Sequence, residues 1–487
     1  MKKTNVSMVT LAIFMTTFMT AIEGTIVSTA MPTIVSDLDG LEMMSWVVSI
    51  FLLMTAVSTP LYGKLADSLG RKPVFLFGIA LFVIGSALCA FSHNMIELII
   101  FRVIQGLGSG AIQPVAITII ADLYKLAKRA KMLGLNSSFW GVASIIAPLL
   151  GGFIVQHLSW HWIFLINVPL GIIAFLLVLV FLKEPKHSSS SKLDLKGTVY
   201  LSIFLLSLMV LLQELGADIN PLILAVLAII AIVAAAIFFR VEKRAEDPIM
   251  PLSMLKNREF LSINLVTLII SGVVIGFEFY LPTWMQGVNG TSASIAGFAV
   301  TPSSLMWIVG SFVVGAVLSK WGIKQTFNLM HIVLMLTDIA LLLAPIGTPF
   351  WVFCLIAVFN GFAFGTIITA SQIDSQILVP KEQIGIATGF NTLMKYLGQT
   401  LMISIYGIVF NTVISNNLAK HPNLTQAMMN KIVSVQQAKS LDPNLVGSLR
   451  QVLLNALKGV YLVSLIVLII SILLNQIYKN RKFTTQK

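Results

Sequence analysis

The sequence is poor in charged residues and in cysteine. Only 11% of its 487 residues are charged and 57% are apolar, whereas soluble domains have about 25% charged and about 45–50% apolar residues. This composition excludes a soluble enzyme. The two cysteines, Cys89 and Cys354, both lie in apolar stretches, so they form no disulfide framework and offer no spacing for metal ligands.

The sequence also lacks the motifs of nucleotide-driven and enzymatic chemistry. No Walker motif, zinc cluster, nucleophile elbow or dinucleotide fingerprint occurs in a suitable context. We therefore expect no enzymatic activity, no cofactor and no metal site.

Long apolar runs are abundant instead. A membrane-spanning helix needs about 20 mostly apolar residues, because the hydrocarbon core is about 30 Å thick. The sequence predicts fourteen such helices, at about 7–29, 43–62, 73–91, 97–119, 132–156, 162–182, 197–214, 221–239, 261–281, 296–318, 327–346, 350–373, 385–411 and 454–477. The predicted fold class is an all-α integral membrane protein embedded in the lipid bilayer.

The positive charge follows the predicted topology. The 32 Lys and Arg exceed the 20 Asp and Glu by 12. With a cytoplasmic N-terminus, 25 of the basic residues fall in inner segments and none in the six short outer loops, as the positive-inside rule requires. Both termini are thus predicted to be cytoplasmic, with the protein in the plasma (inner) membrane, and the charge reflects orientation rather than nucleic-acid binding.

One segment is repeated. Gly63–Lys72 has a weaker copy, Gly315–Lys324, which begins 252 residues later. Secondary transporters are built from such repeats, with the substrate site near the midplane between them. The predicted domains are a six-helix bundle at 1–183, a linker with two extra helices at 184–260, and a second six-helix bundle at 261–487, which includes a long outer loop at about 412–453.

Five motifs in order resemble the fourteen-helix drug:proton antiporter branch of the major facilitator superfamily. They are the loop Gly63–Lys72, the run Arg102–Gly108, a fifth-helix group of Gly134, Pro148, Gly151 and Gly152, the run Trp160–Pro169 with His161 in place of Arg, and Tyr280–Pro282 with Gln286 and Gly287. The resemblance covers nearly the whole chain. It implies the superfamily fold with fourteen transmembrane helices.

The first motif is predicted to form a cytoplasmic latch. Its glycines permit a tight turn, and Asp67 stands where a helix N-terminus favours negative charge. Pairs between this loop and the next inner loop would close the inner face and separate when it opens. The latch residues are Gly63, Asp67, Gly70, Arg71, Lys72, Asp122 and Arg129. The alternative is a solvated turn that only satisfies the positive-inside bias.

The fifth-helix motif predicts a weak point in that helix. Pro148, followed by Gly151 and Gly152, removes backbone support and permits bending. This bending either serves the transport cycle or is a static kink.

Three acids, Glu23, Glu278 and Asp338, lie inside predicted membrane helices, where ionisable groups are costly and are candidates for function. By the predicted helix limits Glu23 lies roughly 9 Å and Arg102 roughly 8 Å below the outer surface. We therefore expect these two to face each other. The pair is either poised to exchange a proton or is a permanent structural ion pair.

The other two acids belong to the second half. Glu278 is expected to line the central cavity on the ninth helix, in a coupling or substrate role, unless it is merely interfacial. Asp338 on the eleventh helix serves either proton traffic or internal hydrogen bonding. Lys395 on the thirteenth helix disfavours highly charged cations, which leaves neutral, zwitterionic, monocationic or anionic substrates open.

The sequence thus predicts a proton-coupled antiporter that exports small amphipathic drugs or toxic compounds by alternating access, with protons and the substrate as partners. It predicts no oligomeric state. One alternative is a dedicated exporter or flippase of a single endogenous metabolite or lipid. Another is a membrane sensor or scaffold that transports nothing.

Overall fold

The computed structural model describes residues 4–124, 126–184, 195–214, 221–245, 252–380 and 383–478, and within these ranges it is all-helical. The N-terminal bundle contains α1 (Val6–Asp37), the short η1 (Leu41–Met43), α2 (Met44–Leu69), α3 (Arg71–Ala90), α4 (Met95–Leu123), α5 (Leu126–His157), α6 (Trp162–Leu165) and α7 (Asn167–Phe181). Two further helices follow, α8 (Leu195–Glu214) and α9 (Pro221–Glu242). The C-terminal bundle contains α10 (Leu252–Leu255), α11 (Arg258–Thr283), the π-helix η2 (Trp284–Val288), α12 (Ala293–Trp321), α13 (Ile323–Leu343), α14 (Phe350–Ile377), α15 (Ile384–Lys420), α16 (Gln426–Ile432), α17 (Val435–Ala438) and α18 (Pro443–Gln476).

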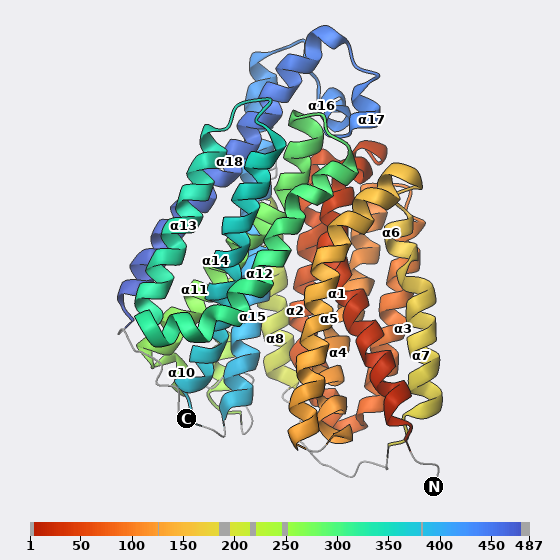
Figure 1. Ribbon diagram of the computed structural model, residues 1–487, viewed down its shortest axis with the longest axis vertical. Coiled ribbons are helices and arrows are strands. Elements are labelled where there is room, and N and C mark those ends of the chain that lie inside the picture. The colour runs from red at the N-terminus through yellow and green to blue at the C-terminus, as the bar shows by residue number, and fades with distance from the viewer. Residues whose placement is uncertain are drawn as a thin grey trace.

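The two bundles share one packing pattern (Figure 1). In the N-terminal bundle α1 packs on α5 and α7, α3 on α4 and α7, and α2 on α4. In the C-terminal bundle α11 packs on α15 and α18, α13 on α14 and α18, and α12 on α14. The bundles meet through α5 with α12 and through α2 with α15, while α8 pairs with α9 and packs against α2 and α15.

Twelve helices of the described residues are long and apolar enough to cross a membrane. Two more apolar stretches, Gly141–His157 in α5 and Lys196–Leu212 in α8, are shorter than a span of 18 residues. The chain is therefore a multi-pass membrane protein by length and composition of its helices.

The two ends of the bundles differ. We call one the termini end, since α1 begins there and α18 ends there, and the other the distal end, which carries η1, η2, α16 and α17 (Figure 1). The prediction of a long loop at 412–453 is wrong in its limits. α15 continues to Lys420 and α18 begins at Pro443, so 421–442 remain, and they hold two short helices.

The repeated segment is less of a loop than expected. α2 runs to Leu69 and α3 begins at Arg71, so a single residue, Gly70, separates them. Its φ of 98° suits glycine, because other residues are strained there. Gly322, with a φ of 76°, separates α12 and α13 in the same way.

Close glycine contacts show how the two bundles correspond. A Cβ on Gly106 of α4 would lie 2.7 Å from the Phe51 carbonyl oxygen of α2, and a Cβ on Gly361 of α14 would lie 2.0 Å from the Ser303 carbonyl oxygen of α12. Phe51 and Ser303 are 252 residues apart, like the repeated segments. The repeat therefore equates positions of α2 and α3 with those 252 residues later, and positions of α4 with those 255 residues later.

Candidate functional site

The interior of the N-terminal bundle holds a buried charge pair. Glu23 of α1 and Arg102 of α4 are both 1% exposed, and Arg102 Nη1 donates to Glu23 Oε1. The same guanidinium donates through Nε to the Val47 carbonyl oxygen at 3.0 Å, and it lies over the Phe51 ring at 4.1 Å from the centroid. The expected contact between Glu23 and Arg102 is present.

Three buried polar side chains complete this network. Asn167 of α7 donates to Glu23 Oε2 at 2.9 Å. Gln105 accepts from Arg102 at 2.7 Å and donates to Ser86 of α3 at 2.7 Å. Both carboxylate oxygens thus have donors, and a fully satisfied buried network rigidifies its surroundings. The sequence analysis assigned no role to Asn167 or Gln105, although both lie in motifs that it quoted.

The depth used to predict this contact was wrong. α1 continues to Asp37, so Glu23 lies fourteen residues before its end, about 21 Å at 1.5 Å per residue. Arg102 lies seven residues after the start of α4 at Met95, about 10 Å by the same measure. The two residues can meet because, towards the distal end, α1 extends further beyond Glu23 than α4 extends beyond Arg102.

Glu278 of α11 differs from Glu23 in its surroundings. It is partly exposed, whereas Glu23 is buried and accepts hydrogen bonds from Arg102 and Asn167. Lys395 of α15 interacts with it electrostatically and lies 5.9 Å from the centre of the Trp307 ring. α11 also continues into η2 as far as Val288, so Glu278 lies ten residues, about 15 Å, before the end of this apolar stretch, rather than three residues before it.

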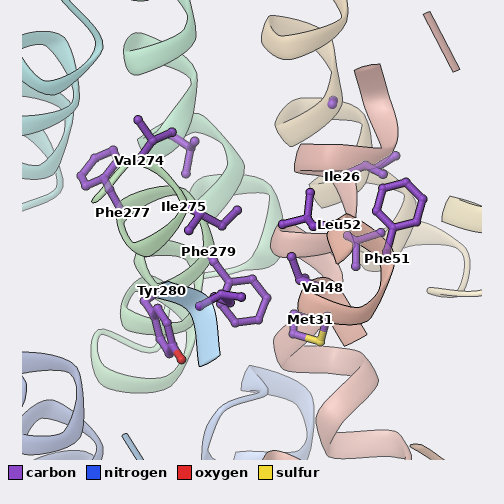
Figure 2. Packing of buried hydrophobic residues seen from close by; sticks show 14 of the residues in the cluster. Ile26, Met31, Val48, Phe51, Leu52, Val274, Ile275, Phe277, Phe279 and Tyr280 are labelled. Atoms are coloured by element: carbon purple, nitrogen blue, oxygen red, sulfur yellow. The ribbon is translucent and has the colours of Figure 1, made fainter. Parts of the chain in front are cut away.

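α11 faces both bundles. Figure 2 shows Phe279 between α11 and the helices α1 and α2, where Val48 and Met31 contribute to the same apolar cluster. The Tyr280 ring packs against Tyr406 and Phe410 of α15, inside the C-terminal bundle. Successive residues of this helix thus point to the junction of the bundles and to the interior of the C-terminal bundle.

Asp338 of α13 lies inside the C-terminal bundle. It is 3% exposed, and its Oδ2 has no hydrogen-bond partner among the described residues. The structure therefore separates the three membrane acids into a paired one, a partly exposed one and a sealed one.

The latch residues are brought together only in part. Arg71 Nη1 forms an ion pair with Asp122 at the termini end, and it also donates to the Thr118 carbonyl oxygen at 3.4 Å. The side chains of Asp67 and Arg129 lie outside the described part of the structure. The described pair joins two helices of one bundle.

Glu184 and Lys72 fasten this corner of the N-terminal bundle. Glu184 accepts from the backbone N–H groups of Arg71 and Lys72 at 2.9 Å each, where an anion at the start of α3 is favourable. Lys72 Nζ donates to the carbonyl oxygens of Leu179 and Leu182 at 2.7 and 2.8 Å, at the end of α7. Glu184 was not predicted from the sequence, because its position in the chain is 113 residues from Arg71.

The repeat reproduces the lysine contact. Lys324, which is 252 residues after Lys72, donates to the Gln476 carbonyl oxygen at 2.9 Å at the end of α18. Arg71 has the apolar Ile323 as its repeat equivalent. Both bundles thus share the lysine cap, and the N-terminal bundle adds an ion pair.

The fifth-helix motif lies at the junction of the bundles. A Cβ on Gly152 of α5 would lie 2.6 Å from the Ala293 carbonyl oxygen of α12, and a Cβ on Gly297 would lie 2.2 Å from the Pro148 carbonyl oxygen. A Cβ on Gly151 would meet Ile26 of α1 at 2.9 Å. α5 remains a continuous helix through Pro148, and the Gly134 surroundings lie outside the described part.

Four hydrogen bonds join the bundles near the distal end. Gln286 donates to the Thr29 carbonyl oxygen at 3.0 Å, and Gln437 of α17 donates to Asp37 at 2.9 Å. The other two join the Leu41 N–H to Asn430 at 3.3 Å and Asn411 to the Glu42 carbonyl oxygen at 2.8 Å. These bonds, with the α5–α12 packing, hold the distal end closed.

Comparison with known proteins agrees with this architecture. Residues 13–403 match the Major Facilitator Superfamily. The chain belongs to this superfamily of transporters. The chain is 37% identical to the Bacillus subtilis "Multidrug resistance protein 3" over 427 residues. The alignment covers 86% of this chain and 82% of that protein.

A second relative of this superfamily member is the Staphylococcus aureus "Multidrug efflux pump SdrM", 32% identical over 403 residues, or 82% of this chain and 89% of that protein. The fold of the present chain resembles that of a bacterial homolog of the human lysosomal transporter Spinster, which was solved in an inward-facing, occupied conformation. The TM-score is 0.69 at 17% identity, with 96% of both chains covered. The chain is thus a transporter by family and not an enzyme.

Proposed function

We propose that this superfamily member is a proton-coupled antiporter that exports small amphipathic drugs or toxic compounds by alternating access. The relatives named as multidrug resistance and efflux proteins support the substrate class. The observation that carries the mechanism is the closed distal end. Its hydrogen bonds between bundles, such as Gln437 to Asp37 and Gln286 to the Thr29 carbonyl oxygen, are single contacts that would break when this end opens.

The proposal includes the topology. Fourteen membrane-spanning helices would comprise the twelve apolar helices together with α5 and α8. The shared packing of the two bundles supports a division at 1–183, 184–260 and 261–487. Basic residues at the termini end support cytoplasmic termini in a plasma membrane, so the distal end would face outward and the closed state would be open to the cytoplasm.

We propose Glu278 as the carboxyl that binds the proton or substrate between the bundles. Its side chain is partly exposed, so a substrate or water can reach it. Together with Lys395 it forms a site without net charge when both are ionised, which favours neutral and monovalent amphiphiles over dications. Glu23, held by Arg102 and Asn167, is proposed as a structural partner rather than the site of exchange.

The test is export driven by a pH gradient in proteoliposomes that contain the purified protein and a fluorescent amphipathic cation. We expect Glu278→Gln to lose gradient-driven transport. Glu97→Gln is the matched control, because Glu97 accepts a hydrogen bond from the His93 N–H in an exposed loop.

Each outcome decides the proposal. Flux of many amphiphiles that needs the gradient supports it. A narrow range limited to one lipid or metabolite would identify a dedicated exporter or flippase, and no flux at all would identify a sensor or scaffold. If Glu278→Gln and Glu23→Gln both keep full gradient-driven export, neither acid carries the proton.

A further inference from the structure

The interior of the C-terminal bundle holds a second group of polar side chains that the proposed export site does not use. We call it the Asp338 pocket, defined by Asp338 of α13, Tyr280 of α11, Tyr406 of α15, and Tyr461 and Ser464 of α18. All five are at most 3% exposed. Tyr280 and Tyr406 rings are 6.3 Å apart, and Ser464 lies close to both Asp338 and Tyr406.

The polar atoms of this pocket lack partners. Asp338 Oδ2 and the hydroxyl groups of Tyr280, Tyr406 and Tyr461 are buried and have no hydrogen-bond partner among the described residues. Each unsatisfied buried polar group costs about 1–3 kcal/mol. Four such atoms in neighbouring side chains are too many to be tolerated as unpaired groups in one bundle.

Buried water is the kind of partner that satisfies such groups. Globular proteins hold roughly one buried water for every 27 residues, and each makes about three hydrogen bonds to groups that otherwise lack a partner. A pocket with three phenols and a carboxyl is polar enough to retain water, whereas empty cavities are lined by apolar groups.

The repeat shows what is unusual about the acid. Asp338 is 252 residues after Ser86, so it occupies on α13 the position that Ser86 occupies on α3 within the Glu23 network. The equivalent of Arg102 is Ala357, which is fully buried in α14. The C-terminal bundle has therefore placed an acid where its counterpart has a hydroxyl, and has no arginine to pair with it.

The other titratable groups around Asp338 provide no cation. Tyr406 faces it from α15 and Tyr461 from α18, and Tyr280 of α11 faces Tyr461. On α13 itself, His331 lies two turns away and is bonded to Ser471 of α18 at 2.7 Å. Among the described residues, no cation is one of the groups that act on Asp338 or Tyr461. The other charged residues on the packed helices are Lys320, Asp374, Arg450, Lys458, Arg258, Glu259, Glu278, Lys324, Lys395 and Lys420.

A carboxylate without a cation is unfavourable in this position. An isolated buried charge costs far more than a neutral acid, so the group takes up a proton instead. In the neutral form its O–H donates a hydrogen bond and its second oxygen still accepts one, which suits water and phenol neighbours.

We propose that the Asp338 pocket is a water-filled proton-binding site inside the C-terminal bundle, in which Asp338 holds one exchangeable proton. The proposal rests on the proposed proton-coupled function and names a second place where the proton resides. The step is a transfer of H⁺ from a hydronium ion, formed when a proton from bulk solvent passes along the pocket waters, to Asp338 Oδ2. The carboxylate becomes a neutral carboxyl and the hydronium becomes water, with no change in oxidation state. In the cycle Asp338 takes up this proton while the protein is open to the outside, and releases it towards the cytoplasm in the state open to the inside.

Infrared difference spectroscopy of the purified protein after a pH jump measures this proton directly. We expect the carbonyl stretching band of a buried protonated carboxyl, lost in Asp338→Asn and shifted in frequency in Tyr406→Phe. In water enriched in oxygen-18 we expect isotope-sensitive O–H bands that disappear with Asp338→Asn. Tyr478→Phe is the matched control, since the Tyr478 hydroxyl already donates to Asp374 at 2.5 Å.

Transport gives a second readout. We expect Asp338→Asn to lose export driven by a pH gradient while it retains exchange of substrate on both sides of the membrane, and Asp338→Glu to restore part of the coupling. Loss of exchange together with coupling shows a folding defect, and the infrared spectra of Tyr406→Phe then decide the proposal.

The results separate the two proposals. If Asp338→Asn removes no carboxyl band from the wild-type spectrum, or if the wild type has no protonated carboxyl, the Asp338 pocket is overturned whatever the transport data show. A wild type without gradient-driven export overturns the proposed function, while the infrared bands still report whether Asp338 holds a proton.

Discussion

The two bundles use one scaffold for two kinds of buried polar chemistry. Both have a turn made by a single glycine, Gly70 or Gly322. In both a lysine, Lys72 or Lys324, contacts carbonyl oxygens at the end of the bundle's last helix, which is α7 or α18. Both also have close glycine packing, of α4 on α2 and of α14 on α12. In the N-terminal bundle the acid is matched by Arg102 and all its acceptors are filled. In the C-terminal bundle the acid stands alone among phenols.

The difference separates structural charge from exchangeable charge. A satisfied ion pair resists protonation and fixes helix positions, whereas an unmatched acid gains or loses a proton with little rearrangement of its neighbours. In the proposed mechanism the two bundles divide these roles: the N-terminal bundle supplies a rigid ion pair and the C-terminal bundle supplies the proton site.

The largest expected effect comes from removing the cation of the N-terminal bundle. Arg102→Ala, which copies Ala357, leaves Glu23 buried without its partner, and we expect a loss of about 3–5 kcal/mol in the free energy of unfolding. The measurement is unfolding of the purified protein by titrating a denaturing detergent against a mild one.

A double variant provides the control for this prediction. Arg102→Ala combined with Glu23→Gln removes the unmatched acid as well, so it should be more stable than Arg102→Ala alone. Equal losses in the single and double variants would show that Arg102 acts through packing on Phe51 and not through charge.

The elements of this comparison differ in how far sequence predicts them. The apolar runs predicted the helices, because membrane spans have a composition of their own. The contact of Glu23 with Arg102 was expected correctly, but from depths along the helices that the structure does not bear out. Helix ends were missed at Leu69, Asp37 and Val288, since helices continue past the membrane through polar or mixed sequence.

Partners distant in the chain were not predictable by the same means. Glu184 and Asn167 are ordinary polar residues until the fold places them against α3 and Glu23. The Asp338 pocket was missed because tyrosines in an apolar run resemble core residues, and only the folded packing shows that their hydroxyl groups lack partners.

A second prediction compares packing within a bundle with packing between bundles. Gly361→Ala places a Cβ against the Ser303 backbone inside one bundle, where we expect about 1–3 kcal/mol of overpacking to reduce the free energy of unfolding. Gly152→Ala meets the Ala293 backbone of the other bundle, and separation of the bundles relieves that clash. We therefore expect it to open the distal end with little loss of stability.

Distances between spin labels at Leu158 and Lys439 measure this opening. Gly389→Ala is the control, because a Cβ there meets nothing within 4 Å. If Gly152→Ala loses as much stability as Gly361→Ala at an unchanged label distance, the junction of the bundles is as rigid as their interiors.

A smaller effect tests whether the lysine caps are equivalent. Lys72→Met loses contacts with two carbonyl oxygens and Lys324→Met with one, and each cap is worth about 0.3–1 kcal/mol at a helix C-terminus. We expect both variants to unfold at a slightly lower proportion of denaturing detergent than the wild type, and we expect the decrease to be larger for Lys72→Met. Lys439→Met, at an exposed position, should change nothing, and a larger effect of Lys324→Met would contradict the stronger fastening of the N-terminal bundle.

The smallest expected effect concerns pH at the distal ends of the bundles. Partial burial lowers the pKa of His161 below its usual 6.5, against the pull of Asp37, so the folded protein favours the neutral ring. Its contribution to stability is therefore complete above about pH 6.5 and is lost as the pH falls below that value. The His161 ring stacks on Trp160, whose Nε1 donates to Asp37 at 2.9 Å. Protonation of His161 therefore acts on Asp37, which also accepts a hydrogen bond from Gln437 across the junction of the bundles.

The melting temperature of His161→Gln should fall less than that of the wild type between about pH 8 and about pH 5. His421→Gln, at the exposed distal end of the other bundle, should follow the wild type. Equal acid sensitivity in all three proteins would place the titrating group elsewhere.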